Sequence, residues 1–275
     1  MNRVSNYVAT PLVSLSRFDH SACEPHRDPP EEAAPNFSVN FIERGGFRLR
    51  VARREWQVSA ATVFVTTPGM VFRVRHAEEF PRDVSFLVDY HPEFSEGLPG
   101  EEARAFERQP PALPLTNRLA YLHALLKRAS HGADALAAET LAGELFAAVT
   151  LAAAPGRRLY ERRQLAWYVE RVEAARTLME SAYGAPHTLA SLARFTGMSP
   201  FHFVRVFGEL AGAPPHRYLV RVRLARAAER LRDGGSVTET CFATGFSNLS
   251  HFIRLFKRRF GVSPSRYSRT APPER

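Results

Sequence analysis

The chain has 275 residues, of which 45% are hydrophobic and 24% charged, so it is long enough for two domains that each bury a core. It contains no apolar run of membrane length and no apolar signal core near its start, and its two cysteines, Cys23 and Cys241, suggest no disulfide framework. These features argue against a membrane protein or a disulfide-rich secreted one and favour a reducing, cytoplasmic setting.

The net charge of +9 is unevenly distributed along the chain. From residue 186 to the C-terminus the basic residues outnumber the acidic ones by 15 to 5, whereas the preceding chain is close to neutral. An asymmetry of this kind predicts a C-terminal domain that binds a polyanion, attached to a neutral partner domain.

The N-terminal part, residues 1–98, is predicted to be all-β. In NFSVNFIERGGFRLRV the apolar residues alternate on both sides of Gly45–Gly46, which predicts a hairpin with Phe37 and Phe41 facing inward. Two more short strands are expected around Thr67–Gly69, and another in RDVSFLVDY. Many short strands with glycine and proline turns are typical of a barrel or jelly roll.

A helical segment, residues 99–156, is expected to follow the strands. Apolar residues recur at helical spacing in two stretches, one marked by Leu119 and Leu122 and the other by Leu141 and Leu145. Such a helical pair is either a dimer interface or simple packing on the barrel, and the sequence favours neither. We treat the segment as a dimerisation or linker region.

No motif for catalysis or for cofactor binding is present. The segment before residue 32 scatters His20, Glu24, His26 and Glu31 among prolines, and His76 stands apart without the His-x-His pair of a metal-binding barrel. Gly-x-Ser-x-Gly and phosphate-cradling glycine motifs are also absent. The sequence therefore predicts no catalytic residues, no metal, no cofactor and no enzymatic activity.

The C-terminal part contains one unit twice. TLASLARFTGMSPFHFVRVFGELAGAPPHRY (Thr188–Tyr218) aligns with SVTETCFATGFSNLSHFIRLFKRRFGVSPSRY (Ser236–Tyr267), and glycine, proline, arginine and phenylalanine recur at matched positions. In each copy a short helix is expected to end at a glycine, Gly197 or Gly245, before a capped second helix begins. This pattern predicts two helix-turn-helix units, whose second helices can enter the DNA major groove.

The stretch between the two copies, PPHRYLVRVRLARAAERLRDGG, has the apolar spacing of a helix. Pro214–Pro215 marks its start and Gly234–Gly235 its end. A helix of roughly 18 residues is about 27 Å long. That length is close to the ~34 Å between successive major-groove faces on one side of B-DNA. The connector is therefore expected to set the two second helices into adjacent grooves.

Residues from about 165 to 269 resemble the DNA-binding domain of AraC/XylS-type transcription regulators. The resemblance rests on GMSPFHFVRVF…GAPPHRYLVRVRLARAAERL and GFSNLSHFIRLFKRRFGVSPSRY. It implies two helix-turn-helix units joined by a long helix, within residues 160–270, behind an effector-binding or dimerisation domain. Asn248 departs from the pattern, because the family often has an acidic residue there, but Asn also caps helices well.

The resemblance extends to the whole fold. The N-terminal strands look like the cupin-type barrel that commonly precedes this DNA-binding module. The expected fold is therefore two-domain, with an N-terminal all-β cupin-like barrel followed by helices and an all-α C-terminal domain.

By this resemblance the second helix of each unit reads DNA. Arg205 and Arg254 are the best candidates for base contacts, because a guanidinium can bond guanine O6 and N7 together. The alternative role for Arg205 is an ion pair with Glu209. The alternative role for His202 and His251 is helix capping or packing. The expected base-reading residues are Phe201, His202, Val204, Arg205, Leu249, Ser250, His251, Ile253 and Arg254. The expected phosphate contacts are Ser199, Ser247, Asn248, Lys257, Arg258 and Arg266.

Together these features predict a sequence-specific, DNA-binding transcription regulator. The expected partners are double-stranded DNA, a small-molecule effector in the barrel, a second copy of the chain and, for an activator, RNA polymerase. No membrane partner is expected. The alternative is an effector-independent regulator whose barrel serves only dimerisation or protein interaction.

Overall fold

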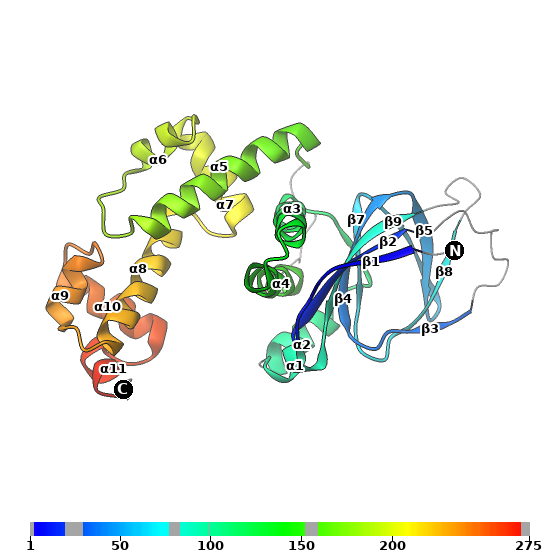
Figure 1. The fold of residues 1–275 in the computed structure, drawn as a ribbon, viewed down its shortest axis with the longest axis horizontal. Helices are drawn as coiled ribbons and strands as arrows, with labels where there is room; N and C mark the ends of the chain where they lie inside the picture. The colour runs from blue at the N-terminus through cyan, green and yellow to red at the C-terminus, as the bar shows by residue number, and fades with distance from the viewer. Residues whose placement is uncertain (1–2, 20–29, 77–82, 99, 152–158, 271–275) are drawn as a thin grey trace. The chain divides into compact units, whose positions relative to one another are not determined.

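The computed structural model of the protein describes residues 3–19, 30–76, 83–98, 100–151 and 159–270. The chain divides into two compact units, Met1–Glu161 and Arg162–Arg275 (Figure 1). The first unit holds the strands β1 to β10 and the helices α1 to α4, and the second holds only helices, α5 to α11. The predicted fold class is thereby confirmed. No helix in the described ranges is long and apolar enough to cross a bilayer.

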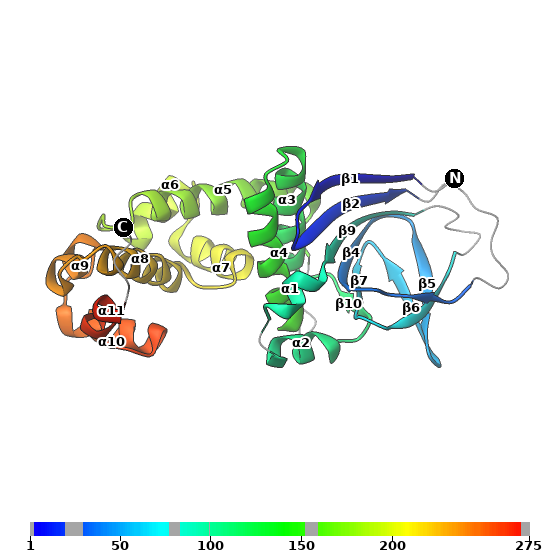
Figure 2. The same cartoon turned by 60° about the horizontal axis from the view of Figure 1, so that its bottom comes forward.

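The strands form two antiparallel sheets that curve around a common interior (Figure 2). The larger sheet runs in the order β1 (Arg3–Ala9), β2 (Val13–Asp19), β9 (Val84–Tyr90), β4 (Phe37–Arg44), β7 (Thr62–Thr66), β10 (Ala112–Pro114). The smaller sheet runs in the order β3 (Glu32–Ala33), β8 (Val71–Arg75), β5 (Gly46–Val51), β6 (Arg54–Ser59). The result is the barrel-like all-β unit that the short, turn-separated strands predict.

The hairpin predicted around Gly45–Gly46 is wrong. β4 pairs with β7 and β9, whereas β5 pairs with β6 and β8, so the chain passes from one sheet to the other at this point. Gly45 has φ of 73°, a left-handed conformation that glycine adopts without strain. The hairpin lies one strand later, between β5 and β6, where Ala52 takes φ of 53° in place of the usual Asn or Gly. Alternation identified these strands but not their partners.

The larger sheet buries one apolar face against helices, and its other face, which mixes polar residues with apolar ones such as Ile42 and Phe64, lines the barrel. Phe37 and Phe41 are buried, as predicted, but Phe37 contacts Phe106 and Phe146, and Phe41 stacks on His123 at 4.4 Å. The intervening residues of β4 line the barrel interior instead. An apolar core of this unit therefore lies between the larger sheet and the helices, and another, which includes Leu49 and Val58, lies inside the barrel.

The helices of the N-terminal unit are α1 (Pro92–Glu96), α2 (Gly100–Glu107), α3 (Asn117–His131) and α4 (Ala135–Thr150). Thr116 caps α3 and Asp134 caps α4 through hydrogen bonds to backbone N–H groups. The two helices lie side by side and contact β1 and β2 (Figure 1). The predicted helical segment also contributes a strand, because β10 lies within it and pairs with β7.

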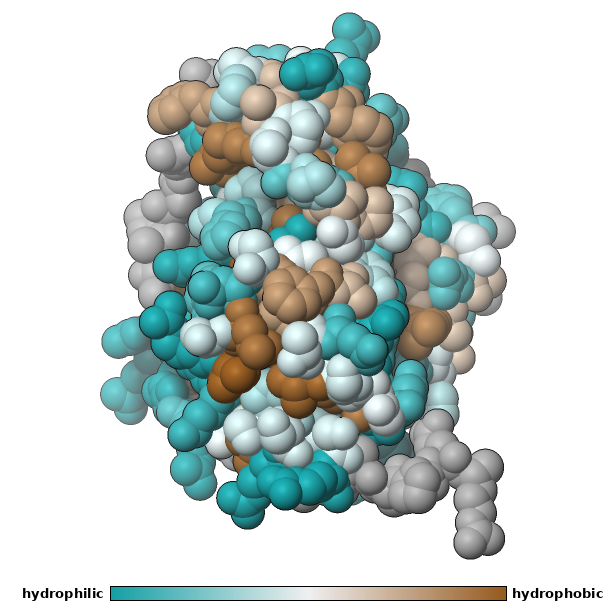
Figure 3. All heavy atoms as spheres, turned by 90° about the vertical axis from the view of Figure 1, so that its left-hand side faces the viewer, coloured by the Kyte–Doolittle hydropathy of each residue, from teal (hydrophilic) through white to brown (hydrophobic). Residues whose placement is uncertain are grey.

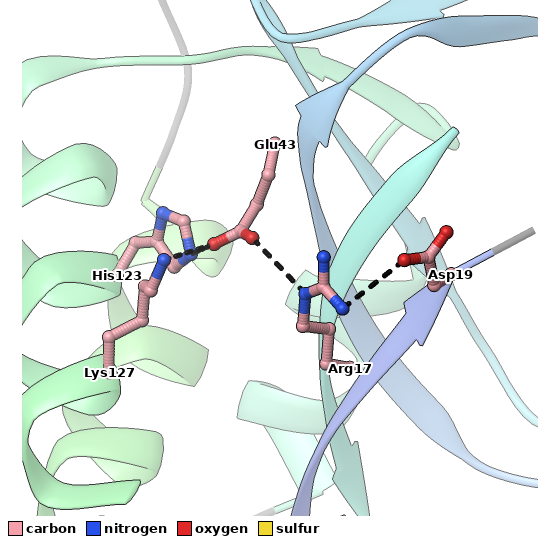
Figure 4. Close-up of polar contacts among 5 residues, drawn as sticks. All are labelled: Arg17, Asp19, Glu43, His123 and Lys127. Carbon is pink, nitrogen blue, oxygen red and sulfur yellow. Dashed lines mark hydrogen bonds and ion pairs between the residues drawn. The ribbon is translucent and has the colours of Figure 1, made fainter. Parts of the chain in front are cut away.

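A chain of charged side chains joins the larger sheet to α3 (Figure 4). Glu43 accepts a hydrogen bond from Lys127 at 2.5 Å and lies 3.5 Å from Nε2 of His123, beyond a well-formed hydrogen bond. Arg17 is 3.9 Å from Glu43 and 3.4 Å from Asp19. The proximity of His123 and Lys127 lowers the pKa of Glu43 to about 2. Burial of the imidazole lowers the pKa of His123.

The C-terminal unit consists of α5 (Arg162–Ser181), α6 (Leu189–Phe195), α7 (Pro200–Ala211), α8 (Pro215–Arg232), α9 (Val237–Ala243), α10 (Leu249–Phe260) and α11 (Pro264–Thr270). The pairs α6–α7 and α9–α10 are the two helix-turn-helix units, and α8 is the connector. Gly197 and Gly245 take φ of 68° and 84° in the two turns. Phe252 and Phe256 are fully buried in a core that also contains Leu231 of the connector.

Candidate nucleic-acid interface and barrel cavity

The two candidate reading helices, α7 and α10, begin and end in the same way. Ser199 accepts a hydrogen bond from the backbone N–H of His202 at 3.3 Å, and Asn248 accepts one from His251 at 2.8 Å. Each helix has 12 residues and ends at a left-handed glycine. Because caps and glycines fix the helix ends, matched positions in the two helices have equivalent local geometry.

The first reading helix presents Phe201 and Arg205 to solvent. Phe201 is 83% exposed, an unusual state for a phenylalanine, and Arg205 is exposed one turn further along. Among the described residues no ion pair joins Arg205 to Glu209, which was the alternative for this arginine. Val204 is half-buried.

His202 has a structural partner. Its Nε2 lies 2.9 Å from the hydroxyl of Tyr168 on α5, and Gln164 donates to the same hydroxyl at 3.1 Å. The histidine therefore helps to hold α7 against α5. Base contact by His202 stays a prediction that would compete with this hydrogen bond.

The second reading helix exposes Ser250, His251 and Arg254. Leu249 and Ile253, which were expected among the exposed residues, are only half-exposed because they also pack against the buried core of this half of the unit. Any base contact that these two make would use the part of the side chain that the core leaves uncovered.

Of the six residues expected at phosphates, Ser199 is exposed and caps α7, four lie at the ends of α10, and Arg266 lies on α11. Ser247, Asn248, Lys257, Arg258 and Arg266 are all exposed. Asn248 rather than Ser247 caps the helix. Three consecutive basic residues, 257–259, occupy the last turn of α10, where positive charge also complements the helix dipole.

Arg223 on α8 has a role that the sequence analysis missed. Its guanidinium donates to the backbone oxygens of Tyr183 at 2.8 Å, Gly245 at 2.8 Å and Ala185 at 2.9 Å. A Cβ atom at position 245 would lie 2.8 Å from the Arg223 Cζ atom. The connector is thus bound both to the loop after α5 and to the second turn. The only sequence signal is Gly245 itself, because an arginine in a basic helix looks like part of a solvated face.

The C-terminal unit also exposes aromatic residues outside its reading helices. Phe195 at the end of α6 and Phe242 on α9 are each 55% exposed. On the face shown in Figure 3, hydrophobic patches interrupt a mostly hydrophilic surface. Contiguous exposed apolar patches often mark contact surfaces, whereas single exposed apolar residues are common on any protein.

The barrel contains a cavity of about 470 Å³ that is partly open to solvent. Four phenylalanines contribute to its wall, Phe18, Phe47, Phe64 and Phe72. A polar wall on the larger sheet is made by Asn36, Ser38, Asn40, Thr66 and Asp89. The volume lies within the usual range for small-molecule sites, and a mostly apolar wall with a few polar groups is typical of them.

No three His, Cys, Asp or Glu side chains in the described part of the chain lie close enough to hold a metal ion. Glu31 pairs with Arg73 at 3.1 Å, and His76 Nε2 lies 2.5 Å from Oδ1 of buried Asp83. His20, Glu24 and His26 lie outside the described residues.

Comparison with known proteins gives matches in both units. A family model described as an AraC-like ligand binding domain matches residues 16–146, and a helix-turn-helix domain model matches residues 192–270. An HTH-type transcriptional regulator of Mycobacterium tuberculosis is 36% identical over 85 residues, which are 30% of this chain and 33% of that protein. The HTH-type transcriptional activator RhaS of Escherichia fergusonii is 48% identical over 54 residues, 19% of each chain. The chain thus spans about a third or less of the length of these curated relatives.

Among solved structures, a probable AraC family transcriptional regulator from Rhodopseudomonas palustris is 33% identical. The match covers 38% of this chain and 99% of that chain, with a TM-score of 0.36. The assignment rests on the two family models, which together match residues 16–146 and 192–270: the chain belongs to the AraC family of transcription regulators.

Proposed function

We propose that the chain is a sequence-specific DNA-binding transcription regulator in which both α7 and α10 read base edges. The observation that carries the proposal is the duplication. Two helices of equal length, with equivalent caps, each present an exposed arginine at the matched position, Arg205 or Arg254. An 18-residue helix without internal proline or glycine connects the two units.

The two classes of DNA contact have different consequences. Arg205 and Arg254 suit bidentate hydrogen bonds to guanine, which discriminate among bases. Lys257, Arg258 and Arg266 suit phosphate contacts, which add affinity for any sequence and make it fall with salt. Because the neighbours of the two arginines differ, the site read by one chain should be asymmetric.

We further propose that the barrel binds a small-molecule effector. A cavity of about 470 Å³ with a mixed apolar and polar wall supports this role over a barrel that serves only dimerisation or protein interaction. A second copy of the chain would pair through α3 and α4, where Leu136 and Leu151 are exposed at the two ends of α4.

The remaining partners follow from regulation of transcription. RNA polymerase would be a partner if the chain activates. The site of action would be the cytoplasm, where the DNA of the bacterial relatives lies, and no membrane or catalytic role is part of the proposal.

The test is a footprint of the full chain on a site selected from random DNA. Two protected major-groove segments about one helical turn apart are expected. Arg205→Ala should relax base preference in one segment and Arg254→Ala in the other. The exposed Arg53→Ala, in the turn between β5 and β6, is the matched control and should change neither. Protection of a single segment, or an Arg205→Ala chain that binds like the wild type, would contradict reading by both units.

A further inference from the structure

The barrel cavity contains a hydrogen-bond chain whose direction is fixed. Oγ1 of Thr66 lies 3.1 Å from the backbone oxygen of Asn36. Because that oxygen can only accept, the single hydroxyl proton of Thr66 is donated to it. Ser38 must then donate to Thr66 across 2.7 Å and accept from Nδ2 of Asn40 at 3.0 Å. The amide of Asn40 is therefore held with its nitrogen toward Ser38.

Asp89 lies in the same wall. Ser38 is paired in register with Asp89 on one side and with Thr66 on the other, so the three side chains form one row across β9, β4 and β7. Nδ2 of Asn36 donates to Oδ2 of Asp89 at 3.0 Å. Because a carboxylate only accepts, the Asn36 amide is also held with its nitrogen toward the row.

This arrangement leaves acceptors without donors. Among the described residues no hydrogen bond reaches Oδ1 of Asn36, Oδ1 of Asn40 or the second carboxylate oxygen of Asp89. Asp89 is half-buried and, within the same part of the chain, has no ion-pair partner. Acceptors and a charge that are partly withdrawn from water are stabilised by a ligand that brings donors.

The charge of the cavity wall favours a cation. Its carboxylates are Glu32 at the exposed rim, Asp83 and Asp89, and no lysine or arginine is among the described residues that line it. Asp83 already has His76 at 2.5 Å, which leaves Asp89 as the inner carboxylate open to a ligand. An anionic ligand would be repelled by this wall, whereas an ammonium group would form charge-assisted hydrogen bonds with it.

Aromatic rings line the cavity beside the polar row: Phe47 and Phe72 come from the smaller sheet, and Phe64 is paired in register with Asn40 on the larger one. Phe64 packs edge-to-face with Phe47 at 5.9 Å and with Phe72 at 5.3 Å, and all three line the cavity. Such rings bury the apolar body of a ligand, and their faces attract cations.

We infer that the effector of this regulator is an organic cation: a small molecule with a protonated amine against Asp89 and an apolar or aromatic body against Phe64 and its neighbours. The inference rests on the proposed effector role of the barrel. The cavity volume of about 470 Å³ leaves room for a body larger than one ring.

The test compares probes of matched shape and different charge on the full chain. Benzylamine, benzyl alcohol and benzoate are compared by thermal shift and calorimetry, and the amine is extended in steps to 4-phenylbutylamine. The amines should raise the melting temperature, benzyl alcohol should raise it less, and benzoate should leave it unchanged. Equal or tighter binding of benzoate, or no binding of any amine in the series, overturns the inference.

The variant Asp89→Asn keeps the shape of the side chain and removes its charge. It should weaken amine binding about tenfold to a hundredfold, the range for a hydrogen bond to a charged group, and leave benzyl alcohol binding unchanged. Glu93→Gln on α1 removes an exposed carboxylate outside the cavity and is the matched control. Amine binding that is unchanged in Asp89→Asn overturns the inference even if the amines bind.

DNA affinity is measured separately with and without the amine that binds most tightly. This separates failure of the inferred ligand class from failure of the proposed regulatory function. Asp89-dependent amine binding that leaves DNA affinity unchanged supports the ligand class and contradicts regulation by the barrel. Specific DNA binding by a chain that binds no amine leaves the DNA-reading function standing and overturns the inference.

Discussion

Replacement of Arg223 by alanine should loosen the second helix-turn-helix unit without removing any contact to DNA. The guanidinium of Arg223 donates three hydrogen bonds to backbone oxygens, at 2.8, 2.8 and 2.9 Å, and one of these oxygens belongs to Gly245 in the second turn. Without the side chain, the turn loses its hydrogen bond to the connector, and only the apolar packing around Leu231 and Phe252 still holds the reading helix against it. Affinity for specific DNA should fall even though Arg223 itself binds protein.

The size of the effect follows from the three bonds. Hydrogen bonds to charged groups contribute about 1.5–3 kcal/mol each when they are shielded from water. Arg223 and its three partners are half-buried, so water replaces part of each bond. We therefore expect Arg223→Ala to lower the free energy of unfolding of the C-terminal unit by about 2–4 kcal/mol.

Urea unfolding followed by tryptophan fluorescence measures this loss of unfolding free energy in the C-terminal unit alone. The chain has two tryptophans, Trp56 in β6 and Trp167 in α5, so a Trp56→Phe background restricts the fluorescence signal to the C-terminal unit. The exposed Arg226→Ala is the matched control on the same helix. Its ion pair with Glu229 spans 2.9 Å at the surface, and its loss should cost less than about 1 kcal/mol.

A double-mutant cycle with Gly245→Ala tests the reasoning directly. In the wild-type background this change imposes left-handed strain and also displaces the guanidinium, because the new Cβ would lie 2.8 Å from Cζ of Arg223. In the Arg223→Ala background only the strain remains, about 1–2 kcal/mol. The two losses should therefore be less than additive. Strict additivity, or an Arg223→Ala chain as stable as Arg226→Ala, would refute the proposed tie.

Arg254→Ala should weaken binding to the selected DNA site by about 1–3 kcal/mol and relax the preference at one base pair. Lys257→Ala should weaken binding to all sequences alike, and titrations with specific and random DNA measure both effects. Glu43→Gln should lower the melting temperature at pH 7. Since the folded pKa of Glu43 is about 2, below its ordinary 4.5, the wild-type advantage should be complete above pH 4.5 and disappear as the pH falls towards 2 in a melting series. Phe256→Ala, in a fully buried position, should cost about 3–5 kcal/mol in urea unfolding, whereas Phe201→Ala, 83% exposed, should stay within about 0.5 kcal/mol and weaken DNA binding instead.

The helical unit was predictable because its signals are local. Caps such as Ser199 and Asn248, turn glycines such as Gly197 and the four-residue spacing of Phe252 and Phe256 act through bonds and contacts within one or two turns of chain. Because the helix-turn-helix unit occurs twice in the sequence, signals of the same kind appear at matched positions in both copies. The two helix-turn-helix units, their turn glycines and the connector could therefore be predicted from the sequence.

Contacts between distant residues were decided only by the tertiary structure. Alternation marked β4 and β5 as strands, but strand partners depend on sheet packing, so the expected hairpin at Gly45 was wrong. The same holds for function. The sequence placed arginines on the reading helices by helical geometry, yet it could not show that Arg223 bonds to Gly245, that His202 meets Tyr168, or that the polar residues of the larger sheet face a cavity. Each of these joins residues far apart in the chain, and their approach depends on how whole elements pack rather than on any local preference.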